Sequence, residues 1–190
     1  MKEHVKKLRT KIARANFSIN QMKNFLDKKH LKLLVNAYVK SHIEYNCNLL
    51  SLCNKSTLKP LTIQFKKTIR SLCNAKYRAY TAPLFKKERI LPIEKQIEFH
   101  GLKFMHSYYY DYCPKSFNGT WKLNKDQNNH NTRARDDFFM ERTSLVYFDN
   151  HPLYKFPKLW NNMDNYLKKI PEKTEFLKAL KTNLLNKIEE

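Results

Sequence analysis

Glycine is almost missing from this sequence, because Gly101 and Gly119 are the only two glycines among its 190 residues. Sheet-rich folds use glycine in tight turns and bulges, so its scarcity favours helices joined by polar loops. Two isolated glycines also exclude a glycine-rich loop of the kind that cradles phosphate groups. The chain is 42% hydrophobic and 13% aromatic, which is typical of a chain that folds around a core rather than a disordered one.

Acidic residues are scarce in the first half of the chain. Residues 1–89 hold 21 lysines and arginines against four acidic residues, a net charge of +17, whereas residues 90–190 hold 16 against 13, a net charge of +3. A surplus of this size repels itself unless a polyanion neutralises it, so the charge favours the phosphate backbone of a nucleic acid as partner. The alternative is that lysine accumulated through the base composition of an AT-rich genome.

Cysteine-dense motifs and long apolar runs are lacking as well. The four cysteines lie far apart with no Cys-x-x-Cys pair, which argues against a disulfide framework or a zinc site and favours an intracellular protein of the nucleus or cytoplasm. No stretch approaches the roughly 20 apolar residues of a membrane span, and residues 1–7 lack the apolar run of a signal peptide. We therefore expect no membrane partner, no metal and no cofactor.

The tandem carboxylates Asp136 and Asp137 are the strongest candidates for a catalytic pair. Polymerases and nucleases hold two magnesium ions with paired aspartates. Here the pair follows Arg133-Ala134-Arg135, and no third acidic residue stands in a comparable apolar frame. We interpret both carboxylates as partners in surface salt bridges, and we assign no catalytic residue.

Apolar residues at helical spacing predict a mainly α fold. The predicted helices span residues 3–26, 28–47, 57–74, 92–112, 158–168 and 172–188. Residues 114–135 are polar and predict a long loop, and residues 143–148 are the candidate for a short strand pair.

The ends and buried sides of these helices follow from particular residues. Asp27 suits an N-cap for the second helix, and Ser56 or Thr57 suits one for the third. Pro114 is expected to end the fourth helix. The apolar patterns run from Val5 to Leu26 in the first helix and include Tyr38 in the second. In the fourth they include Phe104 and Tyr108.

Basic residues gather on the polar sides of the first and third helices. Lys6, Arg9 and Arg14 fall outside the apolar stripe of the first helix. The third helix has its own basic edge, which lies opposite its apolar stripe. That edge consists of Lys59, Lys66 and Arg70, with Lys67 beside them. The alternative for both sets is an ordinary solvated face of a surface helix.

Aromatic residues are interleaved with this positive charge. Phe17 falls on the polar side of the first helix, and Tyr77 and Tyr80 flank Arg78 just after the third. Aromatic rings stack on unpaired bases with about 1–3 kcal/mol each. The alternative is that Phe17 packs on a neighbouring element and that the two tyrosines form the rim of the core.

Several local motifs occur in an order that resembles the region downstream of the catalytic palm in reverse transcriptases of non-LTR (LINE-type, jockey-like) retrotransposons. Each motif alone is weak, and their order and spacing carry the resemblance from about His4 to Leu185. The motifs are residues 38–45 (Tyr-Val-Lys-Ser-His-Ile-Glu-Tyr), 64–70 (Gln-Phe-Lys-Lys-Thr-Ile-Arg), 81–85 (Thr-Ala-Pro-Leu-Phe), 90–93 (Ile-Leu-Pro-Ile), 131–133 (Asn-Thr-Arg), 157–161 (Pro-Lys-Leu-Trp-Asn) and 176–185.

The resemblance implies a thumb, a helical bundle that grips the template–primer duplex, followed by a carboxy-terminal extension. It places the thumb-like unit at residues 1–89 and the extension at residues 90–190. It matches a basic helix of the family with Gln64, Lys66, Lys67 and Arg70. It also matches a Thr-Arg pair with Thr132 and Arg133, and a Trp-Asn pair with Trp160 and Asn161. For Trp160 a buried anchor is the better interpretation.

The sequence departs from the family because it lacks the fingers and the palm. The aspartate pair that binds metal in the palm is missing as well. We therefore expect a fragment of an RNA-directed DNA polymerase that is inactive alone. Its expected partners are RNA, an RNA–DNA or DNA duplex, and other parts of a reverse transcriptase or a larger assembly. The candidate nucleic-acid-binding residues are Lys6, Arg9, Arg14, Lys59, Gln64, Lys66, Lys67, Arg70, Arg78 and Arg133. The alternative function is a structural, protein-interaction subunit that uses the tyrosine-rich patch of residues 108–112.

Overall fold

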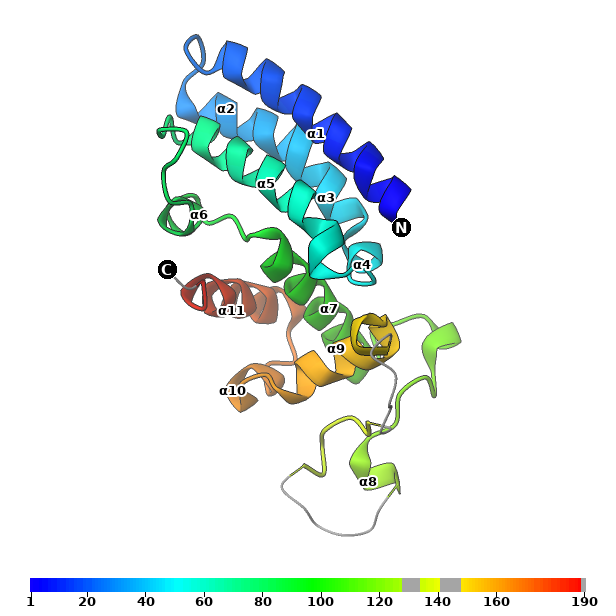
Figure 1. The fold of residues 1–190 in the computed structure, drawn as a ribbon. Coiled ribbons are helices and arrows are strands. Elements are labelled where there is room, and N and C mark those ends of the chain that lie inside the picture. Colours follow the sequence, from blue (N-terminus) through cyan, green and yellow to red (C-terminus); the bar gives the residue numbers. More distant parts are fainter. Residues whose placement is uncertain (128–133, 141–147, 189–190) are drawn as a thin grey trace. The chain divides into compact units, whose positions relative to one another are not determined.

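A computed structural model describes residues 1–127, 134–140 and 148–188 of the chain, and these residues are mainly helical (Figure 1). The predicted fold class is thereby confirmed. The chain divides into two compact units, Met1–Ile97 with Asn183–Glu190, and Glu98–Thr182. Extended pairing in the described residues is limited to an antiparallel bridge between Leu123 and Phe138.

Helix α1 (Lys2–Met22) confirms the first predicted helix but ends four residues earlier than expected. Val5, Leu8, Ile12 and Ile19 are buried along one side of it. Met22 and Leu26, which the pattern placed in the core, are 45% and 36% exposed. They lie at and beyond the end of the helix, where the chain turns and the helical spacing no longer aims side chains at the core.

The second predicted helix is divided into segments. It consists of α2 (Lys28–Val35), the π-helical η1 (Asn36–Lys40) and α3 (Ser41–Tyr45), with α4 (Cys47–Leu50) after them. Asp27 is its N-cap as predicted, because its carboxylate accepts a hydrogen bond from the His30 N–H at 2.9 Å.

The π-helical turn corrects the predicted buried set of this helix. Leu31, Val35, Val39 and Ile43 are buried at a constant spacing of four residues, whereas Tyr38 is 59% exposed. A regular α-helix would rotate residues at this spacing steadily away from the core. The wider η1 turn absorbs that drift, so Val39 takes the place that the pattern gave to Tyr38.

Helix α5 (Lys55–Leu72) confirms the third predicted helix, with Leu58, Leu61, Phe65, Ile69 and Leu72 buried. Its N-cap is Asn54, without a side-chain capping bond, so the prediction of Ser56 or Thr57 as cap was wrong. Both lie inside the helix, which starts earlier than the apolar pattern indicated.

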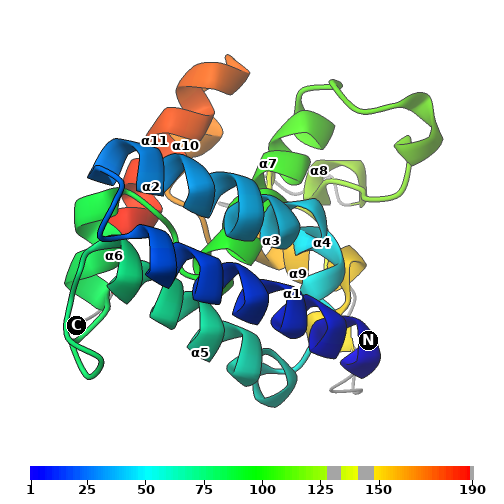
Figure 2. The same ribbon diagram turned by 90° about the horizontal axis from the view of Figure 1, so that it is seen from above.

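Helices α1, α2–α3 and α5 form an up-down-up bundle in which α1 and α5 run parallel and side by side (Figures 1 and 2). Side-chain hydrogen bonds fix this register, because Asn16 bonds to Gln64 and Thr68, and one turn further on Asn20 bonds to Ser71. Helix α6 (Ala82–Glu88) follows the connector after α5.

Helix α7 (Ile93–Tyr109) is the fourth predicted helix, but Pro114 does not end it. Asp111 adopts a left-handed conformation (φ 56°), and the Tyr112 N–H donates to the Ser107 carbonyl at 2.7 Å. This is the six-to-one bond of a Schellman ending. Phe104 and Tyr108, predicted on the buried stripe, are only half-buried.

The chain after α7 holds short elements rather than one long loop. The 3-10 turn η2 (Lys115–Phe117) and α8 (Asn124–Gln127) fall within the predicted polar loop. The strand candidate at 143–148 lies outside the described residues except for Phe148, which opens the 3-10 turn η3 (Phe148–Asn150).

The last part of the chain holds three helices where two were predicted. They are α9 (Pro152–Asn161), α10 (Asn165–Lys168) and α11 (Lys173–Asn186). The helix predicted over residues 158–168 is therefore broken. Asn161, Asn162 and Asp164 lie at the break, and such residues favour caps and turns over helix interiors. Helix α11 buries Phe176, Leu180 and Leu184, in agreement with its apolar pattern.

Candidate nucleic-acid interface

A hollow of about 310 Å³ lies between the first turns of α1 and α5. We call it the α1–α5 groove. Its lining is cationic on the α1 side and rich in hydroxyl groups on the α5 side, with Val5 as apolar floor. The lining residues are Lys2, Lys6 and Arg9 of α1 and Ser56, Thr57 and Pro60 of α5.

Local sequence explains how the groove is built. Lys2, Lys6 and Arg9 follow one another at intervals of four and three residues, so they share one side of α1. Opposite them, Pro60 lies inside α5 and has no N–H to donate to the Ser56 carbonyl one turn before it. Ammonium, guanidinium, hydroxyl and carbonyl groups therefore converge on a hollow, and the donors among them are those that bind phosphate oxygens.

The cations of the groove are not neutralised within the described part of the chain. No carboxylate of a described residue lies within 4.0 Å of the charged groups of Lys2, Lys6 or Arg9, although other lysines of the same unit do have such partners. All three are exposed. Positive charges held together without counter-charges keep a strong potential at this surface.

Two acidic residues of this unit, Glu88 and Glu44, are paired with lysines away from the groove. Glu88 is 4% exposed and pairs with Lys28 and, at 3.3 Å, with Lys32. Burial raises the pKa of its carboxyl, but hydrogen bonds and charges from both lysines outweigh burial, so the pKa lies below the ordinary 4.5. Glu44 pairs with Lys40 at 3.2 Å.

A polar seam continues from the groove along the contact of α1 and α5. Asn16 is 6% exposed, and its amide donates to the Gln64 carbonyl at 3.0 Å and accepts from the Thr68 hydroxyl at 2.6 Å. Ser71 donates to the Asn20 side chain at 2.9 Å. Gln64, a predicted binding residue, is thus half-buried in this seam, where it aligns the two helices.

The remaining candidates of α5 are spread over different sides of the helix. Lys59 and Lys66 are exposed on the side away from the core, as predicted. Lys67 is half-buried and lies on the α1 side, one turn before Ser71. Arg70 is half-buried, and its Nε donates to the Ala79 carbonyl at 2.8 Å, so it also holds the connector after α5 in place.

The exposed aromatic residues are not part of the core or its rim. Phe17 is 67% exposed, and Tyr77 and Tyr80 are 75% and 59% exposed on either side of the exposed Arg78. The interpretation of Phe17 as a residue packed on a neighbouring element is therefore wrong. Arg14 is exposed on α1, while the candidate Arg133 lies outside the described residues.

Sequence reasoning missed the α5 side of the groove. The sequence predicts Ser56 or Thr57 only as capping residues, and nothing in it marks Pro60 as part of a binding surface. The spacing of Lys2, Lys6 and Arg9 was a usable signal for one shared face, but no pattern in the sequence shows which residues of another helix lie opposite.

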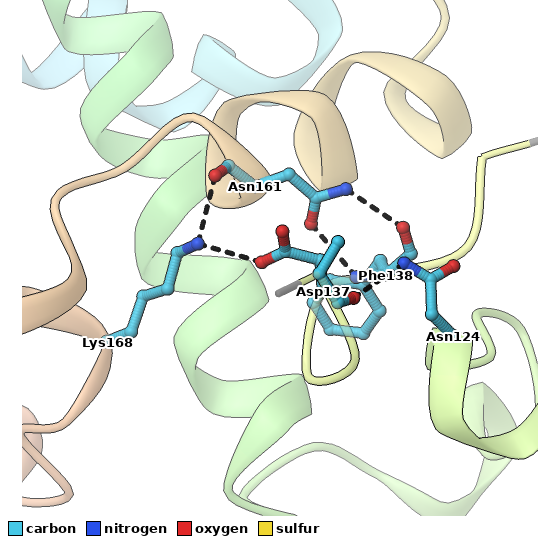
Figure 3. Close-up of polar contacts among 6 residues, drawn as sticks. Asn124, Asp137, Phe138, Asn161 and Lys168 are labelled. Atoms are coloured by element: carbon cyan, nitrogen blue, oxygen red, sulfur yellow. Dashed lines mark hydrogen bonds and ion pairs between the residues drawn. The ribbon is translucent and has the colours of Figure 1, made fainter. Parts of the chain in front are cut away.

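The paired aspartates do not form a metal site. Asp136 lies 3.7 Å from Lys125, and Asp137 pairs with Lys168 at 2.9 Å (Figure 3). The salt-bridge interpretation is confirmed, although Asp137 is half-buried rather than on the open surface. In the described ranges no group of three or more His, Cys, Asp or Glu residues could hold a metal ion.

The tyrosine-rich patch of residues 108–112 is largely engaged within its own unit. The Tyr108 hydroxyl donates to the Trp121 carbonyl at 2.8 Å, and the Tyr110 hydroxyl donates to the Lys168 carbonyl at 2.7 Å. Tyr112 is 57% exposed. Trp160 is fully buried among these rings, as predicted for an anchor.

Comparisons with protein-family models, with curated proteins and with solved structures gave no match to this chain. Across residues 1–127, 134–140 and 148–188, no helix combines the length and the apolar character needed to cross a bilayer.

Proposed function

We propose that this chain binds nucleic acid through the phosphate backbone, with the α1–α5 groove as the centre of contact. The observation that carries the proposal is that Lys2, Lys6 and Arg9 share one hollow with two hydroxyl side chains and, among the described residues, with no carboxylate in reach. A phosphate in the groove would neutralise this charge and release condensed counterions, which is the main driving force of such binding.

Within this proposal the chain is a thumb-like fragment of a non-LTR reverse transcriptase, as the resemblance of its motifs implies. It would grip RNA or an RNA–DNA duplex and would not polymerise alone. The lysines of α5 extend the contact beyond the groove. Contacts to phosphate carry little sequence information, so we expect low sequence specificity.

A salt titration tests the proposal. We would measure the fluorescence anisotropy of a labelled RNA–DNA duplex with the full chain at several salt concentrations. If about six phosphates of the duplex are neutralised, the logarithm of affinity falls with the logarithm of salt at a slope of roughly −5. Weak binding without salt dependence would contradict the proposal and favour a role in protein interaction.

Two charge-matched variants locate the site. Lys6→Glu with Arg9→Glu reverses two cations of the groove, and Lys86→Glu with Lys87→Glu reverses two exposed cations on α6. Both change the net charge equally. We expect the first pair to weaken binding strongly and to flatten the salt slope by about two, while the second has a much smaller effect. Equal effects would show a nonspecific response to total charge.

A further inference from the structure

Phe17 is a large aromatic side chain on α1 about two helical turns beyond the groove, without a visible role in the fold. It is 67% exposed, and in the described part of the chain no other ring lies against it. It follows Lys6 by eleven residues, about three helical turns, so the two share one side of α1 roughly 16 Å apart along the axis.

The register of the two helices places Phe17 at the seam with α5. Its neighbour Asn16 is buried there and bonds to Gln64 and Thr68, and Asn20 bonds to Ser71. Lys67 lies on α5 three residues after Gln64 and four before Ser71, so helical spacing places it near the side of α5 that contacts α1. Phe17 and Lys67 therefore border the same stretch of the seam, one from each helix.

We propose that the α1–α5 surface takes an unpaired strand of nucleic acid, with a phosphate in the Lys2–Lys6–Arg9 groove and a base stacked on Phe17. This inference rests on the proposed function, because it concerns the same surface. In a duplex the faces of the bases are covered by their neighbours, so an exposed phenyl ring gains nothing from a paired strand. An unpaired base offers its face, and such stacking contributes about 1–3 kcal/mol.

Positive charge together with an exposed aromatic ring favours a single strand of nucleic acid over an apolar protein partner. Lys2, Lys6 and Arg9, which have no carboxylate within 4.0 Å among the described residues, precede the ring along α1, and Lys67 of α5 borders the same stretch of the seam. An electrostatic track with aromatic platforms is the general form of sites for single strands.

The test uses fluorescently labelled oligouridine and oligothymidine of about 12 nucleotides, together with a blunt duplex, on the full chain. Phe17→Ala should weaken single-strand binding roughly 5- to 150-fold and leave duplex binding unchanged. The matched control is Phe25→Ala, because Phe25 is 87% exposed but lies in the turn after α1. That control should bind like the unaltered chain. Comparing the two oligonucleotides shows whether RNA or DNA is preferred.

Two further variants separate stacking from apolar contact. Phe17→Tyr keeps an aromatic face and should retain single-strand affinity, whereas Phe17→Leu keeps an apolar side chain without it and should lose affinity like Phe17→Ala. If Phe17→Leu keeps the full affinity for the single strand, the proposed stacking of a base on Phe17 is overturned.

Failure of this inference can be told apart from failure of the proposed function. If Lys6→Glu with Arg9→Glu abolishes binding while Phe17→Ala changes nothing, the backbone grip stands and the base platform is overturned. If Phe17→Ala weakens duplex and single strand equally, the preference for an unpaired strand is overturned. If none of these variants alters binding, both proposals are overturned.

Discussion

The side-chain amide of Asn161 is paired with the backbone of Phe138 through two hydrogen bonds. Its Oδ1 accepts from the Phe138 N–H and its Nδ2 donates to the Phe138 carbonyl, both at 2.9 Å (Figure 3). The amide thus does what a neighbouring strand would do for Phe138, whose ring is 1% exposed. The end of α9 is thereby joined to a segment more than twenty residues away in the sequence.

We predict that Asn161→Ala destabilises the protein by about 1–3 kcal/mol, because it leaves a backbone donor and an acceptor near a buried ring without partners. Asn161→Asp should cost at least as much, since a carboxylate cannot donate to the Phe138 carbonyl. Urea unfolding measures both. Exposed Asn162, next in the chain, is the control, and Asn162→Ala should have a small effect. An equal loss of unfolding free energy in Asn161→Ala and Asn162→Ala would contradict the pairing of Asn161 with Phe138.

Gly101 is predicted to be required by its contact with Phe156. A Cβ atom at Gly101 would lie 2.7 Å from Cδ1 and 2.9 Å from Cε1 of that buried ring. Gly101→Ala gains about 1 kcal/mol of helix propensity, but overpacking costs about 1–3 kcal/mol. We expect net destabilisation in thermal unfolding. In a double-mutant cycle, Phe156→Leu should reduce the cost of Gly101→Ala, and strictly additive effects would refute the clash.

Arg89 offers a site for stabilisation. It ends α6 in the left-handed region (φ 54°), where the Ile90 N–H donates to the Phe85 carbonyl at 3.1 Å. A residue with a Cβ atom costs about 1–2 kcal/mol in this conformation, and glycine avoids that cost. Part of this gain is offset because glycine loses more conformational entropy on folding. Arg89→Gly should therefore raise stability by about 0.5–1 kcal/mol. Arg89→Ala removes the same charge but keeps the strain, so it should bring no such gain.

His106 should make stability depend on pH. The ring is fully buried and stacked on Phe176 at 4.1 Å, and its Nε2 lies 2.9 Å from the Ile170 carbonyl. Burial lowers the pKa of His106 below the ordinary 6.5, although the hydrogen bond to Ile170 opposes that shift.

The sign follows from proton uptake. Below pH 6.5 the unfolded chain protonates this histidine, while the folded chain resists protonation. The free energy of unfolding is therefore highest above pH 6.5 with respect to this group, and it decreases as the pH falls. The loss is at most about 1.4 kcal/mol per pH unit. His106→Gln keeps a donor and does not titrate, so its urea stability should fall less between pH 7 and pH 5. Identical pH slopes would contradict the assignment.

Apolar periodicity and charge, which are local properties, were enough for much of this protein. They predicted helices α1 and α5 with most of their buried residues and the surplus of positive charge in the first half of the chain, while residue type indicated the cap at Asp27 and the anchor Trp160. Such features depend on the intrinsic geometry of a helix and on residue type, and both can be read without knowing what lies opposite.

Other features depended on irregular helix geometry. The π-helical turn moves Val39 into the core in place of Tyr38, and left-handed Asp111 ends α7 before Pro114 is reached. Both are local departures from regular helix geometry. The periodic pattern assumes that geometry, so it could not show them.

The candidate interface itself was decided by tertiary structure. The basic residues of α1 were visible in the sequence, but their placement opposite Ser56 and Thr57, and the exposure of Phe17 beside the seam, arise from the parallel packing of α1 on α5. Hydrogen bonds between residues about fifty positions apart fix that packing, and they join Asn16 to Thr68 and Asn20 to Ser71. A sequence states which side chains a helix carries, whereas the register between two helices follows only from the contacts they make when folded.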